Sequence, residues 1–282
     1  TSKVKNIKDL IVINDKQVPS KIIDKFKKYQ FQKVIITGMG TCYTAAAAIA
    51  MYMRHILRNY FSHIQIEPHI ATEASAFYLK PNMEDTLVIV IAQSGTTIDT
   101  NVYVQMAKER GASALAIANK REGDVTFLVD GTLYIGSGRD IEIAVPSTKT
   151  YTAQVILGYI LTLYISSQLT ESNSKNLTRL KKNIDLIREV PKKIDETFKI
   201  IDKHYDLRKL TEISCYYSSW YIIHDDSPNS VCAMEARIKY SEGCYHTLPY
   251  MHIDQLLKYK IKKSFLTFMT NQSLDKIESK IK

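Results

Sequence analysis

The stretch LVIVIAQSGTTIDT, residues 87–100, carries the strongest single signal in the chain for its fold. Its first six residues, 87–92, are apolar without alternation, which is typical of a strand buried on both faces of a parallel sheet. QSGTT at 93–97 is small and polar, and a helical pattern follows over 98–110, with Gly111 suited to end it. We therefore expect a central strand, a turn rich in hydroxyl groups and a helix.

Strands and helices alternate on both sides of this stretch. Short apolar runs predict strands at 33–37, 63–68, 114–119 and 132–136, and alanine-rich or apolar periodic segments predict helices at 41–59 and 149–168. Such alternation is typical of βαβ units. The expected fold class is α/β, with three α/β/α layers built around a five-stranded parallel sheet.

The chain changes character after this first region. The pattern over 171–204 predicts one or two amphipathic linking helices, broken near Pro191. Alternation then restarts, with strands expected at 215–223 and 264–269 and helices at 227–242 and 271–282. We expect a first domain at 1–170, linking helices at 171–204, and at 205–282 a second, apparently truncated unit of the same kind.

Composition argues against several classes of function. Of the 282 residues, 38 are Lys or Arg and 29 are Asp or Glu, so the net charge is +9, which fits a solvated basic surface or an anionic ligand. No compact basic motif with interleaved aromatics points to nucleic acid. No apolar run approaches the roughly 20 residues of a membrane span, and 155–165 is expected to be a core helix. The cysteines, which show no metal-ligand spacing, predict reduced thiols and a cytoplasmic location; they are Cys42, Cys215, Cys232 and Cys244.

Three turns that lead into helices combine hydroxyl side chains with glycine or proline. They are GMGTCYT at 38–44, QSGTT at 93–97 and PSTKTYT at 146–152. A helix N-terminus offers unpaired N–H groups and the positive end of its dipole, and glycine lets the backbone approach a ligand closely. Ser and Thr are also preferred helix caps, so one such turn alone would favour capping as much as binding. The recurrence predicts a phosphate site.

These segments also carry a family resemblance. In order and spacing, GMGTCYTA (38–45), AQSGTTIDT (92–100) and EIAVPSTKTYTAQ (142–154) resemble the sugar isomerase (SIS) domains, most of all the isomerase half of glucosamine-6-phosphate synthase, the glutamine–fructose-6-phosphate aminotransferase. The resemblance covers 30–170 well and 205–250 moderately. It implies the SIS fold and binding of a sugar phosphate of the hexose-6-phosphate type.

The resemblance also implies which residues hold the phosphate. The matching positions, called the cradle below, are Gly40, Thr41, Cys42, Gln93, Ser94, Gly95, Thr97 and Ser147. Cys42 and Ala92 stand where the family usually has serine, so two hydroxyl groups are missing. A hydrogen bond to a charged group contributes about 1.5–3 kcal/mol, so their loss would weaken binding, although the backbone N–H groups of the turns are expected to remain as donors.

In the second unit, SVCAMEARIKYSEG (230–243) resembles the family helix that carries the isomerase carboxylate. The resemblance implies that Glu242 moves a proton between C1 and C2 of the sugar and that Lys239 assists at the open-chain carbonyl, with Glu235 on a third matching position. Residues three apart share a helix face, and for this spacing alone a surface ion pair is far more common. The family's His-Gly-Pro segment does not occur in the sequence, where His246 or His252 could substitute.

Two hypotheses of function follow. The first is an enzyme, a sugar-phosphate isomerase or aminosugar-phosphate enzyme that needs no metal or organic cofactor and whose use of glutamine would require a separate glutaminase partner. The second is a phosphosugar-binding sensor or regulator without catalysis. It is favoured by Cys42, Ala92, the missing His-Gly-Pro segment and the short second unit, whereas Lys239 and Glu242 argue against it. A third is one portion of a larger synthase, or a scaffold without ligand. Because family members pair their SIS units, a homodimer is expected.

Overall fold

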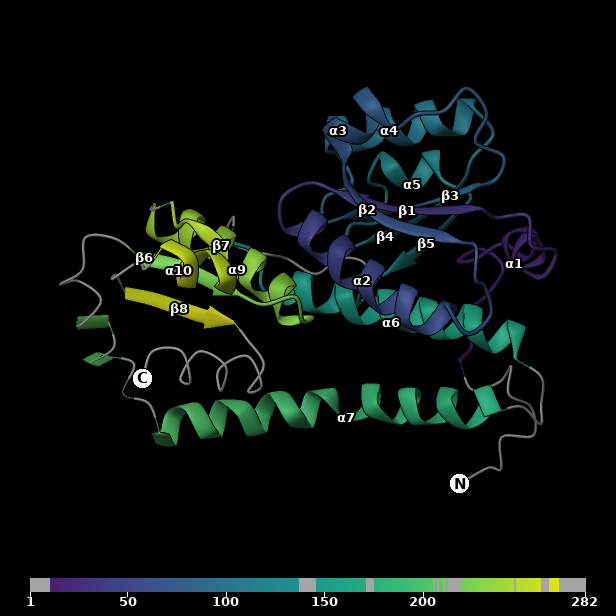
Figure 1. Ribbon diagram of the computed structural model, residues 1–282. Coiled ribbons are helices and arrows are strands. Elements are labelled where there is room, and N and C mark those ends of the chain that lie inside the picture. The colour runs from purple at the N-terminus through teal and green to yellow at the C-terminus, as the bar shows by residue number, and fades with distance from the viewer. Residues whose placement is uncertain are drawn as a thin grey trace. The chain divides into compact units, whose positions relative to one another are not determined.

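The structure, a computed structural model, describes residues 11–136, 146–170, 175–204, 206, 208, 209, 211, 212, 220–245, 247–259 and 264–268. The chain divides into two compact units, Thr1–Asp185 and Leu186–Lys282, and the boundary falls inside helix α7 (Lys175–His204). The first unit holds a five-stranded sheet and the second a three-stranded sheet (Figure 1).

The sheet of the first unit is entirely parallel. Its strands are β1 (Lys33–Gly38), β2 (Gln65–Ile70), β3 (Thr86–Ala92), β4 (Ser113–Ala118) and β5 (Gly131–Tyr134), in the order β2-β1-β3-β4-β5. This confirms the α/β class and the five-stranded parallel sheet. The central strand β3 is the apolar run of the opening stretch, and all of its residues are buried.

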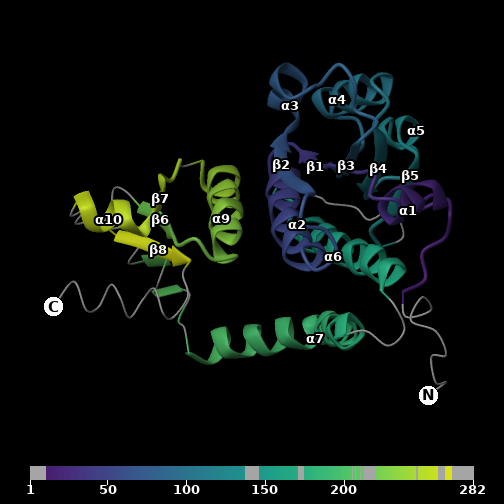
Figure 2. The same ribbon diagram turned by 45° about the vertical axis from the view of Figure 1, so that its right-hand side comes forward.

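Helices cover both faces of this sheet (Figure 2). On one face lie α1 (Ser20–Lys27), α2 (Thr41–Leu57) and α6 (Lys149–Leu169); on the other lie α3 (Ala71–Phe77), α4 (Ile98–Glu109) and α5 (Val125–Leu128). Alternate residues of β3 enter the two cores, with Leu87 and Ile89 on the side of α2 and Val88 and Val90 on the side of α4. Because both faces are covered, the strand needs no polar side and its sequence does not alternate.

Helix α6 packs closely on α2. A Cβ atom at Gly158 would lie 2.4 Å from Cδ1 of Ile49, so only glycine allows this approach. Leu161 and Ile165 are buried in the core shared with α2, as expected of a core helix. By length and composition alone, α6 would also pass as a membrane span, a test that core helices pass as well. The expectation that no apolar run is long enough is therefore wrong, because the helix extends beyond 155–165 at both ends.

Helix α7 is continuous from Lys175 to His204, so the break expected near Pro191 is wrong. A proline inside a helix removes one backbone hydrogen bond and crowds the preceding turn. In a helix of 30 residues the other bonds of the ladder hold the element together. In the first unit its side chains Leu180 and Ile184 are buried, which anchors the start of the helix.

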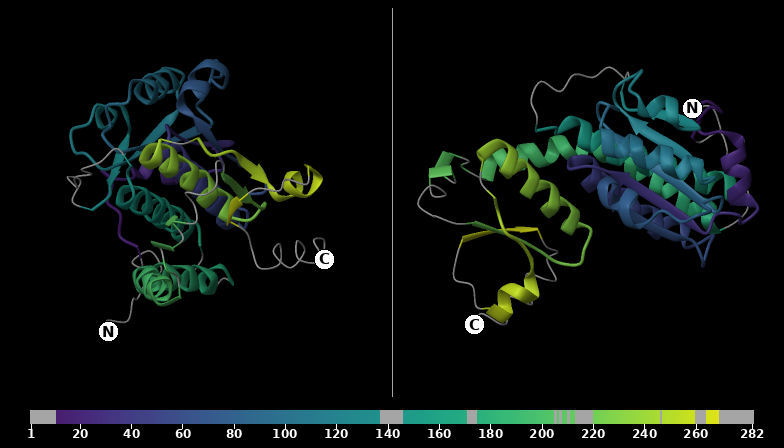
Figure 3. Two further views of the ribbon diagram at one scale, coloured as in Figure 1. Left: turned by 90° about the vertical axis from the view of Figure 1, so that its left-hand side faces the viewer. Right: turned by 90° about the horizontal axis from the view of Figure 1, so that it is seen from above.

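The second unit is also α/β. Its parallel strands are β6 (Trp220–His224), β7 (Tyr250–His252) and β8 (Ser264–Phe268), in the order β7-β6-β8. Helices α9 (Asn229–Cys244) and α10 (Ile253–Tyr259) lie on opposite sides of these strands (Figures 2 and 3). The start of the strand expected at 215–223, and the helix expected at 271–282, lie outside the described residues.

One buried carboxylate ties the edge of the first sheet to two helices. Asp130, just before β5, accepts hydrogen bonds from Nζ of Lys21 at 2.8 Å, from Nζ of Lys108 at 2.7 Å and from the N–H of Ala114 at 2.7 Å. Burial by itself would raise the pKa of Asp130, but these three donors together hold that pKa below its ordinary value. The carboxylate therefore stabilises the fold while it is charged.

We expect Asp130→Asn to lower the free energy of unfolding at pH 7 by about 1.5–3 kcal/mol, the range for hydrogen bonds to charged groups. Because the pKa is lower in the folded state, this stabilisation is complete above the unfolded pKa of about 3.9 and is lost as the pH falls through the folded pKa. Urea midpoints of wild type and variant should therefore converge below about pH 4. A difference that stays constant with pH would contradict this role.

Candidate functional site

Two of the three hydroxyl-bearing turns end neighbouring strands. Strands β1 and β3 pair in parallel with Thr37 opposite Val90, so the turns 38–40 and 93–97 leave the sheet at the same edge. Helix α2 begins at Thr41 and helix α4 at Ile98, and both therefore point their N-termini to this edge. The topology brings together the first two cradle segments, and ligands of open α/β sheets bind at this edge.

The first turn is tightly folded. Gly40 is exposed and has φ +53°, a conformation that side chains disfavour. A Cβ at Gly38 would lie 2.8 Å from the backbone carbon of Cys42, so the chain can close here only over a glycine. The N–H of Cys42 is bonded to the carbonyl of Met39 and the N–H of Tyr43 to that of Gly40. These two N–H groups are thus engaged within the turn, so for them the expectation that the N–H groups remain as donors is wrong.

The side chain of Tyr43, in the first turn of α2, lies near Glu73 and Tyr78. Burial raises the pKa of Tyr43, and the nearby Glu73 and Tyr78 raise it further. The phenol is therefore protonated at neutral pH and keeps an O–H that can donate.

The second turn is held from two sides. Gly95 has φ +74°, and its carbonyl accepts hydrogen bonds from the N–H of Val125 at 3.0 Å and from Nδ2 of Asn101 at 3.2 Å. Oγ of Ser94 lies 2.9 Å from Oγ1 of Thr96. Thr97 takes the N-cap position of α4, yet its side chain makes no capping bond and the residue is exposed. Its hydroxyl does not accept a hydrogen bond from the N–H groups at the start of α4. This argues against the interpretation that Thr97 is present only as a helix cap.

The third segment reaches the first through a buried glutamine. Ser147 is half-buried just before α6, and Gln154, in the second turn of that helix, is 1% exposed. Nε2 of Gln154 lies 3.6 Å from Sγ of Cys42, so the start of α6 contacts the start of α2. Sequence reasoning missed Gln154, although a buried amide in an otherwise apolar helix is a usable signal. Residues 142–145 of this segment lie outside the described part of the chain.

In the second unit, Lys239 and Glu242 contact each other on α9, as their spacing predicts. Nζ of Lys239 lies 2.7 Å from Oε2 of Glu242 and 3.4 Å from Oε1 of Glu235. The side chains of Lys239 and Glu242 are 20% and 28% exposed, whereas those of Lys193 and Glu196, an ordinary surface pair of the same spacing, are 64% and 41% exposed. The pair on α9 is thus less exposed to solvent than the surface pair. Lys239 also contacts a second carboxylate, that of the buried Glu235.

Of the two histidines that could substitute for the missing one, the structure describes His252. His246 lies outside the described residues, while His252 ends β7. Nε2 of His252 is 3.4 Å from Asp226, and its Nδ1 is 3.5 Å from Asp254. Its ring also packs edge to face on His224, with centroids 5.4 Å apart. Among the described residues, no group of three potential metal-ligating side chains is gathered in one place.

Comparison with known proteins supports the resemblance. The family model of the SIS domain matches residues 29–164. The chain is 34% identical over 200 residues to the glutamine–fructose-6-phosphate aminotransferase (isomerizing) of Fusobacterium nucleatum. The aligned residues cover 69% of this chain and 32% of that protein. It is also 34% identical over 204 residues to the enzyme of that name from Pyrococcus horikoshii, covering 71% and 30%. The chain thus spans about a third of the length of these curated relatives.

Solved structures show the same fold. The C-terminal domain of glucosamine-fructose-6-phosphate aminotransferase from Francisella tularensis aligns with a TM-score of 0.74 at 20% identity, covering 98% of this chain and 76% of that one. Glucosamine-6-phosphate deaminase from Thermotoga maritima aligns with a TM-score of 0.67 at 17% identity, covering 99% and 81%. Residues 29–164 of this chain thus form a domain of the SIS family.

Proposed function

We propose that this chain binds a sugar phosphate of the hexose-6-phosphate type in the cradle formed by the turns after β1 and β3 and by Ser147. The observation that carries the proposal is the parallel pairing of β1 and β3, which places two glycine- and hydroxyl-bearing turns side by side where two helices begin. Helix N-termini with hydroxyl donors suit a phosphate group. The names of the relatives, which refer to fructose-6-phosphate and glucosamine-6-phosphate, fit this ligand class.

For catalysis, we propose aldose–ketose isomerisation with Glu242 as the base. The carboxylate would take the proton from C2 of an open-chain aldose phosphate and return it to C1, while Lys239 stabilises the charge that develops on the carbonyl oxygen. The contact of Lys239 with Glu235 and Glu242 holds the two groups within one cluster on α9. No metal or organic cofactor is needed for this step, and transfer of an amino group from glutamine would require a separate glutaminase.

A second candidate is a phosphosugar-binding sensor or regulator without catalysis. It is favoured by Cys42 in the first turn and Ala92 before the second, which lack the usual hydroxyl groups, and by the N–H groups of Cys42 and Tyr43, which are already bonded. A weaker cradle suits a protein that reports the sugar-phosphate level more than one that turns the sugar over. Both candidates place the protein in the cytoplasm, where sugar phosphates are metabolised.

The test of binding is a thermal-shift titration with fructose-6-phosphate, glucosamine-6-phosphate and glucose-6-phosphate. A ligand at about 100 times its dissociation constant should stabilise the chain by about 2.7 kcal/mol. We expect Ser94→Ala to abolish the shift because the variant removes a hydroxyl donor of the cradle. Ser20→Ala, a change at an exposed position on α1, is the matched control and should leave the shift intact. If none of the three sugars shifts the wild type, the cradle has no such ligand.

We also expect the chain to form a homodimer. Helices α3 and α4 contact each other and carry large exposed apolar side chains, among them Phe77, Ile98 and Val102. Exposed side chains of this kind are frequent at protein interfaces. Size-exclusion chromatography with light scattering should give twice the mass of the chain, and Ile98→Asp should shift the molecule toward the monomer. A wild type that is monomeric at micromolar concentration would contradict this prediction.

A further inference from the structure

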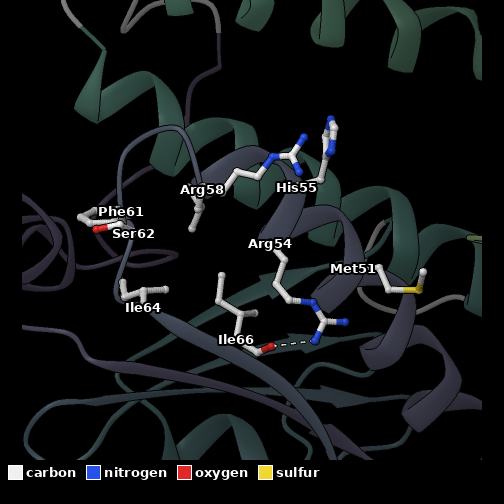
Figure 4. A pocket seen from close by; sticks show the side chains of 9 residues that line it. Met51, Arg54, His55, Arg58, Phe61, Ser62, Ile64 and Ile66 are labelled. Atoms are coloured by element: carbon white, nitrogen blue, oxygen red, sulfur yellow. Dashed lines mark hydrogen bonds between the residues drawn. The ribbon is translucent and has the colours of Figure 1, made fainter.

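A pocket lies at the end of α2 that is away from the cradle. It has a volume of about 420 Å³ and is formed by the last turns of α2, the loop that follows and the first half of β2 (Figure 4). The residues that line it are Met51, Arg54, His55, Leu57, Arg58, Phe61, Ser62, Ile64 and Ile66. Its volume falls within the range of about 300–1,000 Å³ that small-molecule sites occupy.

The lining combines positive charge with an apolar surface. It includes two arginines, which stay charged at every physiological pH, and one histidine, but no Asp or Glu. Of the apolar residues that line it, Met51 and Ile64 are half-buried and leave apolar surface open to a ligand, whereas Leu57, Phe61 and Ile66 are buried. A ligand that fits must therefore offer both a negative group and an apolar part.

The two arginines differ in how they are held. Nη1 of Arg54 donates to the carbonyl of Ile66 at 3.0 Å, which leaves other N–H groups of that guanidinium to donate. Arg58 extends toward His55 and away from Arg54 (Figure 4). Cations in the last turn of a helix also complement its dipole, and this explains their presence on α2. It does not explain why they border a pocket with an apolar wall.

We propose that this pocket binds an organic anion, in which a phosphate or carboxylate group is joined to an apolar ring. Guanidinium groups bind both kinds of anion through paired N–H donors, and the apolar wall buries the ring. Along α2, Arg54 is twelve residues beyond Cys42, or about 18 Å at the rise of an α-helix. The pocket is thus separate from the cradle, and the proposal stands independently of the proposed function.

Isothermal titration calorimetry on the full chain tests this with four probes: 1-naphthyl phosphate, 1-naphthoate, neutral 1-naphthol and inorganic phosphate. At least one naphthyl anion should bind, at least about tenfold more tightly than 1-naphthol or inorganic phosphate, because only it satisfies both parts of the pocket. The tighter of the two naphthyl anions identifies the preferred acidic group. We expect R54Q/R58Q to weaken its binding about tenfold or more.

Three further variants test whether the naphthyl anion binds in this pocket. K181Q/K182Q removes two exposed charges on α7 that do not line the pocket and should not weaken binding. R58Q keeps the hydrogen bond between Arg54 and Ile66. If the double variant does not fold, weaker binding of the naphthyl anion to R58Q is the test of the arginines. S94A should leave binding of the naphthyl anion unchanged. The proposal is overturned if neither naphthyl anion binds, if 1-naphthol binds as well, if K181Q/K182Q weakens binding as much, or if S94A abolishes it.

Discussion

Glu242→Gln is expected to slow the interconversion of glucose-6-phosphate and fructose-6-phosphate by about 100- to 10,000-fold, the contribution of a positioned general base. Glutamine has almost the shape of glutamate but cannot accept the proton from the sugar carbon. It can still accept a hydrogen bond from Lys239, whose Nζ lies 2.7 Å from Oε2 of Glu242. A coupled assay of isomerisation, run beside the thermal shift, should show lost turnover with retained binding.

A matched control exists in the same chain. Lys193 and Glu196 form an ion pair with the same three-residue spacing at 2.8 Å, but both side chains are well exposed. Exposed pairs contribute little to stability, so Glu196→Gln should change neither folding nor turnover. Full activity in Glu242→Gln would exclude this residue as the base. Wild-type binding of a sugar phosphate without turnover would instead favour the sensor.

The sequence was sufficient for the main sheet because its signal is local and strong. The unbroken apolar run 87–92 is typical of a strand covered on both faces, and the alanine-rich segment that starts at Thr41 strongly favours a helix. Five short elements were not foreseen, namely α1, α3, α5, α10 and β7. Each has eight residues or fewer, so a repeating pattern covers too few positions to identify it, and tertiary packing decides whether it forms.

The candidate site could be predicted only in part. Its turn motifs can be recognised from neighbouring residues in the sequence, but its contacts join residues that are far apart in the sequence. The turn motifs identified Ser94 and Thr97 directly from the sequence. The contact of Gln154 with Cys42 joins residues 112 positions apart, and no local pattern predicts it. The bonding of the Cys42 N–H to Met39 depends on how tightly the turn closes, which is also invisible in the sequence.

Gly123 is a further residue that the sequence did not reveal, and it gives the largest expected effect on the cradle. The loop between β4 and α5 packs against the second turn, where a Cβ at Gly123 would lie 2.5 Å from the carbonyl oxygen of Ser94 and 2.9 Å from Cα of Gly95. Real Cβ contacts are not this short, and the atoms they would meet are backbone. The clash can be relieved only if the turn moves.

We therefore expect Gly123→Ala to lower the free energy of unfolding by about 1–3 kcal/mol, the usual cost of overpacking, and to abolish the sugar-phosphate thermal shift. The turn cannot yield freely, because Val125 and Asn101 both hold the carbonyl of Gly95. The control is Gly243→Ala, at an exposed helical position with no atom near the added carbon, which should leave stability unchanged or raise it by up to about 1 kcal/mol. Urea denaturation measures both variants. If Gly123→Ala is destabilised but retains the full shift, the second turn is not where the phosphate binds.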